Sequence, residues 1–175
     1  MAALLATAIF ALGATAQKWH TKTNHTSNIL VMNALRASQQ GKSGIALDLN
    51  GDDKKDLVIG APYARYKKGL GALLIYKNSK NGFSKKPQHV IIGQGNLGWN
   101  IVALEDASQE ACFAAGASND SGNDMPPAGT VTIYSCKEKP SPELTLEGEN
   151  AFDKFGFTLA AGDLNDDGYK DLIVG

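Results

Sequence analysis

The chain has 175 residues, of which 43% are hydrophobic and 20% are charged, and its formal net charge is −1. This apolar content is enough to bury the core of one substantial domain. A nearly neutral chain offers no basic footprint for nucleic acid, so that class of partner is excluded.

Residues 1–16 carry no charge and end in Ala14-Thr15-Ala16, the small-x-small pattern of a signal-peptide cleavage site. We therefore expect a signal peptide at 1–16 and a secreted or cell-surface protein. The alternative is a buried N-terminal helix, because the positive charge that usually begins a signal peptide is missing. No other stretch approaches 18 apolar residues, so no membrane anchor is expected in this chain.

Residues 17–42 form a leader before the first recognisable strand. Within it, Asn28 to Met32 has the composition of a strand, and a flexible leader is the alternative. Asn24-His25-Thr26 in the leader and Asn119-Asp120-Ser121 further on are acceptor sequences for N-glycosylation, which agrees with export.

The first acidic loop, residues 48–56, lies between the expected strands Ile45–Leu47 and Leu57–Ile59. Two further strands are expected at Ala72–Tyr76 and His89–Ile92. Side-chain oxygens at loop positions 1, 3, 5 and 9, with a backbone carbonyl at position 7, are the ligand spacing of a calcium loop. The expected ligands are Asp48, Asn50, Asp52, the carbonyl of Lys54, and Asp56.

The middle segment keeps the strand pattern but lacks the acidic loop. Its expected strands are Asn100–Leu104, Ala111–Ala117, Thr130–Cys136 and Glu143–Glu147. Cys112 stands in the place of the last loop acid, and it faces Cys136 if the two strands are antiparallel. We expect a disulfide, which closes a loop of about 24 residues. By lowering the entropy of the unfolded chain, it should stabilise the fold by roughly 3 kcal/mol. Two buried free thiols are the alternative.

The second acidic loop, residues 163–171, repeats the spacing of the first and runs into the apolar Leu172–Val174. Two matched loops predict two structural Ca²⁺ ions, each of which offsets the mutual repulsion of the carboxylates around it. Empty acidic turns are the alternative. The expected ligands of the second ion are Asp163, Asn165, Asp167, the carbonyl of Tyr169, and Asp171.

The three segments are copies of one unit. Gly60, Gly116 and Gly175 follow one another at 56 and 59 residues, which fits one four-stranded propeller blade with its loops. We therefore predict an all-β fold with blades at about 43–93, 97–148 and, in part, 152–175. These are about two and a half blades of an incomplete propeller.

A closed propeller needs about four to eight blades. A sequence truncated after Gly175 is the favoured interpretation, because an unclosed array exposes strand edges that aggregate. Closure by self-association is the alternative. In a closed ring, residues 17–42 would supply the outer strand of the last blade.

Phe155-Gly156, the second acidic loop and Gly60-Ala61-Pro62 resemble the FG-GAP repeat of the integrin alpha-subunit propeller, over about residues 43–175. The repeat also occurs in the C-terminal part of glycosylphosphatidylinositol-specific phospholipase D. Two departures from the motif are Lys42-Ser43-Gly44 and Leu97-Gly98-Trp99, which stand where Phe-Gly is expected.

The resemblance implies a non-catalytic extracellular propeller for cell adhesion or protein recognition, which binds an extracellular protein ligand or a partner subunit. The alternative is the accessory propeller of a secreted hydrolase. The three histidines of the chain show no catalytic spacing, so no enzyme is expected.

In proteins that this chain resembles, recognition uses the face opposite the calcium loops. Here that face would be formed by Ala61–Gly71 and Ser118–Gly129. Tyr63, Arg65 and Tyr66 are the candidates, because tyrosine and arginine anchor protein interfaces. The alternative is an ordinary solvated loop, with Tyr63 packed against its own blade.

Overall fold

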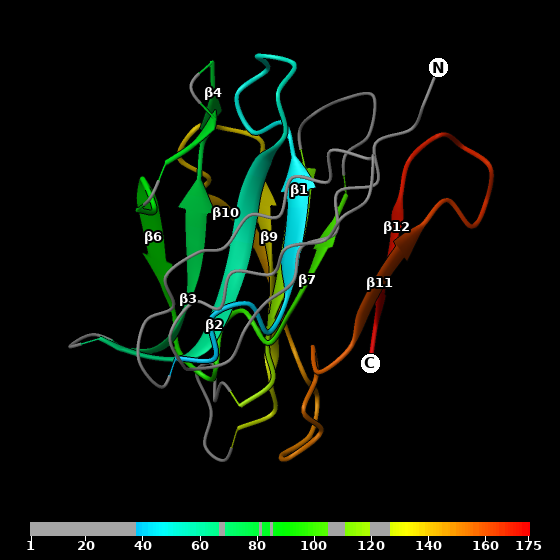
Figure 1. Cartoon of the computed structure of the whole chain (residues 1–175). Coiled ribbons are helices and arrows are strands. Elements are labelled where there is room, and N and C mark those ends of the chain that lie inside the picture. Colours follow the sequence, from blue (N-terminus) through cyan, green and yellow to red (C-terminus); the bar gives the residue numbers. More distant parts are fainter. Residues whose placement is uncertain (1–37, 67–68, 81, 85, 105–110, 120–126) are drawn as a thin grey trace, which may run out of the picture.

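The computed structural model describes residues 38–66, 69–80, 82–84, 86–104, 111–119 and 127–175 (Figure 1). The expected signal peptide, the acceptor sequence at Asn24 and most of the leader lie outside these residues. The described part consists of strands and connecting loops, and it contains no helix with the length and apolarity needed to cross a membrane.

The strands form two complete blades and one pair. The first blade contains, in spatial order, β1 (Gly44–Leu47), β2 (Asp56–Tyr66), β3 (Gly69–Tyr76) and β6 (His89–Ile92). A short hairpin of β4 (Asn78–Ser79) and β5 (Gly82–Phe83) is inserted between β3 and β6. The second blade contains β7 (Asn100–Ala103), β8 (Ala111–Ala117), β9 (Thr130–Ser135) and β10 (Pro142–Glu147). The pair is β11 (Leu159–Gly162) with β12 (Asp171–Val174).

All neighbouring strands within the sheets are antiparallel, and the first strand of each unit lies at an edge of its sheet. β1 lies beside β7, and β7 lies beside β11, so the units follow one another around a common side (Figure 1). This arrangement is that of consecutive propeller blades. The prediction of an all-β fold made of propeller blades is confirmed.

Blade 1 is apolar on both of its faces. Val58 and Leu73 pack with Phe113 and other residues in the cluster between blades 1 and 2. Ile59 and Leu74, which point to the other face, belong to a second cluster. Burial of both faces explains why β2 and β3 read as continuous apolar runs rather than as alternating patterns.

Successive blades approach each other at pairs of glycines. A Cβ atom added to Gly60 of β2 would lie 2.1 Å from the carbonyl oxygen of Gly98. One added to Gly116 of β8 would lie 2.1 Å from the carbonyl oxygen of Gly156. Any larger residue would force the neighbouring blade away, so these glycines set the distance between blades.

The first blade follows the repeat motif in a different register from the one expected. Gly41, rather than Lys42-Ser43-Gly44, matches the later glycines. Gly41 donates its backbone N–H to the carbonyl of Gly60 (2.9 Å), as Gly98 donates to Gly116 (3.1 Å). The shared position has φ of 90° at Gly41, 89° at Gly98 and 83° at Gly156. Because Gln40 replaces phenylalanine, only the glycine of the motif remains in this blade.

Most of the segment expected as a loop at Ala61–Gly71 is paired strand. Arg65 pairs with Leu70 and Tyr66 with Gly69, and the register shifts between Ala61 and Arg65. Pro62 cannot donate a ladder hydrogen bond, so the sequence favours a strand end there. The irregularity in register accommodates it and lets β2 continue.

Candidate calcium loops and recognition face

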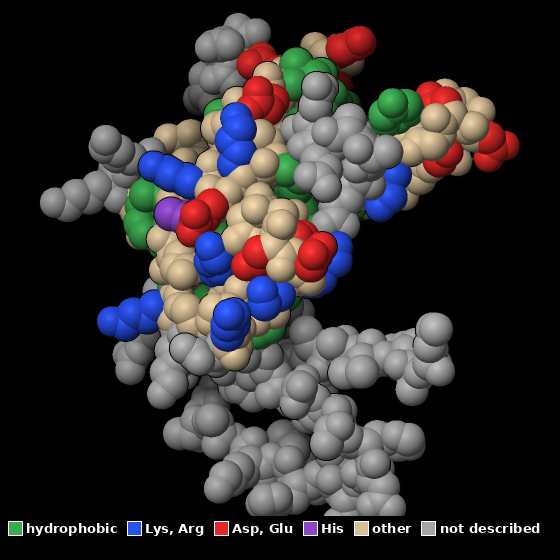
Figure 2. Space-filling model, turned by 90° about the horizontal axis from the view of Figure 1, so that it is seen from above, with side chains coloured by type: hydrophobic (Ala, Val, Ile, Leu, Met, Phe, Trp, Pro, Cys, Tyr) green, Lys and Arg blue, Asp and Glu red, His purple; other side chains and the backbone are tan. Residues whose placement is uncertain are grey.

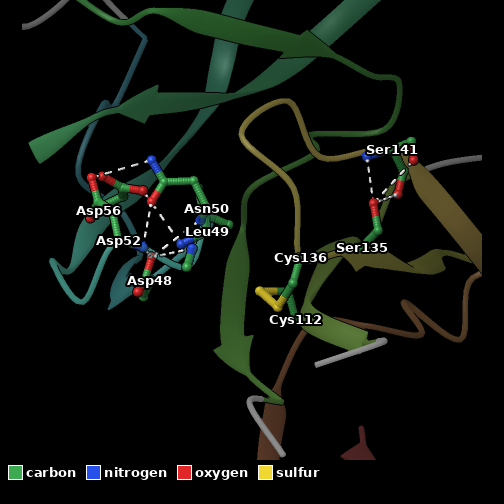
Figure 3. The surroundings of a disulfide bond; sticks show 10 residues. Asp48, Leu49, Asn50, Asp52, Asp56, Cys112, Ser135, Cys136 and Ser141 are labelled. Carbon is green, nitrogen blue, oxygen red and sulfur yellow. Dashed lines mark hydrogen bonds between the residues drawn. A yellow bond between two sulfur atoms is a disulfide. The ribbon is translucent and has the colours of Figure 1, made fainter. Parts of the chain in front are cut away.

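The two acidic loops lie at the same end of the blades, which we call the loop end. The opposite end, with Gly41, Gly98 and Gly156, is the glycine end. In the first loop, both Asp48 Oδ1 and Asn50 Oδ1 accept the backbone N–H of Asp52, each at 3.2 Å (Figure 3). Asp48 Oδ2 accepts the N–H of Asp53 at 2.7 Å. Asp56 Oδ2 accepts the N–H of Leu49 at 3.4 Å and so closes the loop.

The second loop repeats this network. Asp163 Oδ1 and Asn165 Oδ1 accept the N–H of Asp167 at 3.2 and 3.1 Å. Asp163 Oδ2 accepts the N–H of Gly168 at 2.9 Å. Asp171 closes the loop on Leu164 at 2.9 Å. The two loops therefore have one conformation, which their shared spacing specifies.

Both loops require a left-handed backbone at positions 4 and 6. Position 4 is Gly51 (φ 73°) in the first loop and Asp166 (φ 60°) in the second. Position 6 is Asp53 (φ 62°) in the first loop and Gly168 (φ 85°) in the second. Glycine adopts this region freely and aspartate tolerates it, so each loop has one glycine and one aspartate at these positions.

Two acids of the first loop, Asp48 and Asp56, have pKa values shifted in opposite directions. Burial raises the pKa of Asp56, although hydrogen bonds from the backbone of Asn78 and Leu49 oppose the rise. Burial would also raise the pKa of Asp48, but hydrogen bonds from four backbone N–H groups together lower it. The loop backbone therefore stabilises the charged form of Asp48.

The donor set of each loop fits a hard cation. Position 1 and position 3 oxygens converge on the same N–H group, and every candidate side-chain donor is a carboxylate or an amide. Lys54 and Tyr169, whose carbonyls are expected at position 7, donate their N–H groups to Asp52 and Asp167. Within the described residues, no three histidine, cysteine, aspartate or glutamate side chains are already gathered for a metal. The carboxylates instead accept hydrogen bonds from the loop backbone.

Asp56 also joins the loop to the third strand of its blade. Its Oδ1 accepts the N–H of Asn78 at 2.7 Å, two residues after Tyr76 at the end of β3. In blade 2 the equivalent residues are Cys112 and Cys136, because Phe113 pairs with Tyr134 as Leu57 pairs with Tyr76. The disulfide of blade 2, shown in Figure 3, thus occupies the same place as the Asp56–Asn78 hydrogen bond of blade 1.

The expected disulfide between Cys112 and Cys136 is present, with Cα atoms 4.7 Å apart. Cys112 is fully buried. Beside it, the rings of Phe113 and Tyr134 stack with centroids 5.0 Å apart. Burial raises the pKa of Tyr134 to about 12. The bond therefore lies in the apolar core between blades 1 and 2.

At the glycine end, equivalent residues of three units stack on one another. Lys42, Trp99 and Phe157 each follow the glycine of their unit. The Lys42 ammonium lies 4.6 Å from the centre of the Trp99 ring, and the Trp99 and Phe157 rings are 5.2 Å apart. We call these three residues the glycine-end stack. In the sequence, the only sign of this stack is that its three members share one position, directly after the glycine of each repeat.

The three recognition candidates lie at the glycine end in different environments. Tyr63 is 38% exposed, and its ring packs edge-on against Trp99 at 6.2 Å. Arg65 is exposed. Tyr66 is half-buried and packs on the apolar cluster of its own blade. Tyr63 and Arg65 are therefore the two available to a partner.

Asn119, the described glycosylation candidate, is exposed but hydrogen-bonded. Its Nδ2 donates to Asn96 Oδ1 at 3.0 Å, and Asn96 Nδ2 donates to the carbonyl of Pro62 at 3.0 Å. Asn96 itself is buried. This chain of hydrogen bonds joins blade 2 to blade 1 at the glycine end.

Comparison with known proteins identifies the repeat. Residues 41–76 match the FG-GAP repeat family. The chain is 33% identical over 146 residues to integrin alpha-7 of Mus musculus, and this alignment covers 77% of the chain and 12% of that protein. It is 27% identical over 150 residues to integrin alpha-4 of Xenopus laevis, covering 77% of the chain and 14% of that protein.

A second kind of relative is also found. The chain is 28% identical over 145 residues to phosphatidylinositol-glycan-specific phospholipase D of Homo sapiens. This alignment covers 73% of the chain and 17% of that protein. The chain thus spans less than a fifth of the length of each of these relatives.

Proposed function

Because the chain belongs to the FG-GAP repeat family, we propose that it is part of an extracellular, non-catalytic propeller that calcium stabilises and that recognises a protein. The partner is an extracellular protein ligand or a partner subunit. The observation that carries this proposal is that the two ends of the blades carry different kinds of residues. Two loops of one conformation lie at the loop end, and the aromatic groups Tyr63, Trp99 and Phe157 pack together at the glycine end.

The calcium part of the proposal rests on the donor chemistry of the loops. Each Ca²⁺ ion would bind the oxygens at positions 1, 3, 5 and 9, and a carboxylate can bind the ion through one oxygen while the other keeps its hydrogen bond to the backbone. A bound cation supplies the positive charge that holds these oxygens together. The role is structural, since the loops connect the first two strands of a blade.

Calorimetry tests this part directly. Titration of the secreted protein should show two Ca²⁺ ions per chain, with dissociation constants on the order of 10⁻⁴ to 10⁻³ M, as in extracellular modules. Asp52→Ala together with Asp167→Ala should abolish the heat, whereas Glu149→Ala, outside both loops, should leave it unchanged. Absence of calcium heat in the unaltered protein would show that the loops are simple acidic turns.

The recognition part is tested at the other end of the molecule. Cells should adhere to immobilised protein in the presence of calcium, and Tyr63→Ala plus Arg65→Ala should reduce adhesion. Tyr66→Ala affects packing instead and should act through stability. Adhesion unchanged by the first pair would place recognition elsewhere.

Export and modification complete the proposal. A signal peptide at 1–16 and N-glycans at Asn24 and Asn119 are expected on protein secreted from eukaryotic cells. Mass spectrometry of the N-terminal peptide should then show that the chain begins at Gln17, and glycosidase treatment should lower the mass. An N-terminus at Met1 on the secreted protein would contradict the signal peptide.

The accessory propeller of a secreted hydrolase is the second candidate, favoured by the similarity to the phospholipase D. A full-length transcript separates the two. The hydrolase would carry a cluster of metal ligands in a further domain, whereas an adhesion subunit would continue into further extracellular domains.

A further inference from the structure

The nearly neutral net charge conceals a strong asymmetry along the chain. Residues 105–175 contain fourteen acidic and four basic residues, whereas residues 57–104 contain no acidic residue. The seven basic residues of that acid-free stretch are Arg65, Lys67, Lys68, Lys77, Lys80, Lys85 and Lys86. Blade 1 beyond its calcium loop is therefore uniformly positive, and the rest of the chain after it is negative.

The β4–β5 hairpin presents part of this charge at the loop end. Lys80 lies in the turn between β4 and β5, and Lys86 follows β5; both side chains are exposed. The hairpin is held in place, because Phe83 packs on the apolar cluster of blade 1 and Asn78 donates to Asp56. Its lysines are thus displayed by an anchored element.

Two more lysines adjoin the hairpin. Lys54 and Lys55 occupy positions 7 and 8 of the first loop, which the Asn78–Asp56 hydrogen bond ties to the base of the hairpin. Lys54 lies 3.8 Å from Asp52, and this partly exposed ion pair contributes little to stability. Lys77 is already paired with Glu138 of blade 2 at 3.0 Å. Figure 2, seen from the loop end, shows lysine and arginine side chains around the acidic loop and acidic side chains on the projecting third unit.

We propose that this surface, formed by Lys54, Lys55, Lys80 and Lys86 and called the blade 1 lysine surface, binds a linear sulphated polysaccharide. Separate ammonium groups on different turns suit an extended chain of anionic groups. An anchored display limits the side-chain and backbone entropy lost on binding. The proposal goes beyond the proposed function and shares with it only the extracellular location.

An anionic membrane is a poorer match for the same lysines. Peripheral membrane surfaces combine basic residues with apolar side chains that enter the bilayer. Among the described residues, none of the exposed large hydrophobic side chains lies in the first loop or the hairpin. The exposed hydrophobic residues are Tyr63, Val90, Ile92, Leu144, Phe152, Phe157, Leu164, Tyr169 and Ile173.

The test uses the full secreted protein with calcium, and heparin as the probe. Biosensor binding to immobilised heparin should be saturable and should weaken steeply with salt. Lys80→Glu plus Lys86→Glu should lower the affinity by about tenfold or more. The matched control, Lys154→Glu plus Lys170→Glu, makes the same charge change on exposed residues of the third unit and should change it less than about twofold. Equal urea unfolding midpoints would establish that both variants are folded.

Several outcomes would overturn the proposal. One is equal weakening by the two variant pairs, which would indicate attraction by overall charge alone. Another is equal competition by heparin and by chemically desulphated heparin. A third is binding to vesicles that contain phosphatidylserine but not to heparin, which would identify a membrane surface. None of these outcomes bears on calcium binding, so the proposed function is judged separately.

Discussion

At the scale of single residues, the glycines of the repeat are important because they have no side chain. Gly60 and Gly116 lie in ordinary strand conformations, yet each touches the backbone of the next unit. Their role is spatial, whereas that of Gly41 and its equivalents is conformational, because these have positive φ. One repeat therefore uses glycine for two physical reasons.

Gly60→Ala should destabilise the protein by about 1 to 3 kcal/mol, because the added methyl group must displace the Gly98 backbone. Gly162→Ala in β11 is the matched control, since its added methyl group meets nothing within 4 Å. The control should change the free energy of unfolding by less than about 0.5 kcal/mol. Urea unfolding measures both. Equal effects would contradict the backbone contact between blades.

The opposite pKa shifts of Asp56 and Asp48 predict opposite pH dependences in calcium-free protein. The folded-state pKa of Asp56 is raised, so the folded protein binds this proton more tightly than the unfolded chain does. Its contribution to the free energy of unfolding therefore falls as the pH rises from the ordinary value of 3.8 through the raised pKa. Asp56→Asn should remove that decline.

Asp48 behaves in the other sense. Its folded-state pKa is lowered, so its stabilising contribution is complete above 3.8 and is lost as the pH falls through the lowered pKa. Asp48→Asn should therefore reduce stability near neutral pH and matter less in acid. Urea unfolding in a chelator from about pH 3 to about pH 7 compares both variants with the unaltered protein. Parallel curves for the two variants would refute the assignment.

At the scale of elements, blades 1 and 2 join equivalent strand ends by different bonds, a hydrogen bond in blade 1 and a disulfide in blade 2. Each ties the start of its second strand to the end of its third, through Asp56 and Asn78 in one blade and Cys112 and Cys136 in the other. The sequence predicted the cysteine pair from the facing strand ends. It did not predict that Asn78 is the polar counterpart of Cys136, because a backbone N–H donor leaves no trace in residue identity.

An exchange of the two ties tests their equivalence. Cys112→Ala plus Cys136→Ala should lower the free energy of unfolding by about 3 kcal/mol. Cys112→Asp plus Cys136→Asn, which installs the blade 1 arrangement in blade 2, should recover part of this loss, on the order of 1 kcal/mol for one hydrogen bond. Chemical denaturation of the three proteins gives the comparison. A second variant less stable than the first would show that the buried site in blade 2 cannot hold a carboxylate.

The loops and the hairpin show which elements sequence can predict. Loop ligands follow from residue spacing, because the loop conformation is local and both copies repeat it. The β4–β5 hairpin was missed, although Asn81-Gly82 is a turn signal at the start of β5. The extension of β2 past Pro62 depends on pairing with β3, which a local pattern does not specify.

At the scale of the whole molecule, repetition made the fold predictable and the register uncertain. Three copies of one unit identify blades even where single strands are short. The first copy was assigned the wrong register because its motif has no phenylalanine. The positive φ of Gly41 identifies the correct glycine, but this backbone angle cannot be read from residue identity. The contacts of Lys42 with Trp99 and of Trp99 with Phe157 join different units, so only the assembled structure reveals them.

Calcium should stabilise the whole chain by mass action. Two sites of the proposed affinity should raise the free energy of unfolding by roughly 1 to 3 kcal/mol in about 1 mM calcium. Thermal unfolding with calcium, with magnesium and with a chelator measures the effect. Magnesium should act weakly, because it demands a stricter geometry than such loops provide. Identical transitions in calcium and chelator would contradict the proposal.

The glycine contact between units has a consequence for how such a chain can evolve. Backbone atoms are the same in every residue, so a joint made of Gly60 against Gly98 needs no matched pair of side chains. A duplicated gene segment therefore encodes a unit that already fits its own copy. The side chains elsewhere in each unit can then differ, as they do where the middle unit has a disulfide in the place of the Asp56–Asn78 hydrogen bond. A backbone joint of this kind is therefore compatible with tandem duplication followed by independent divergence.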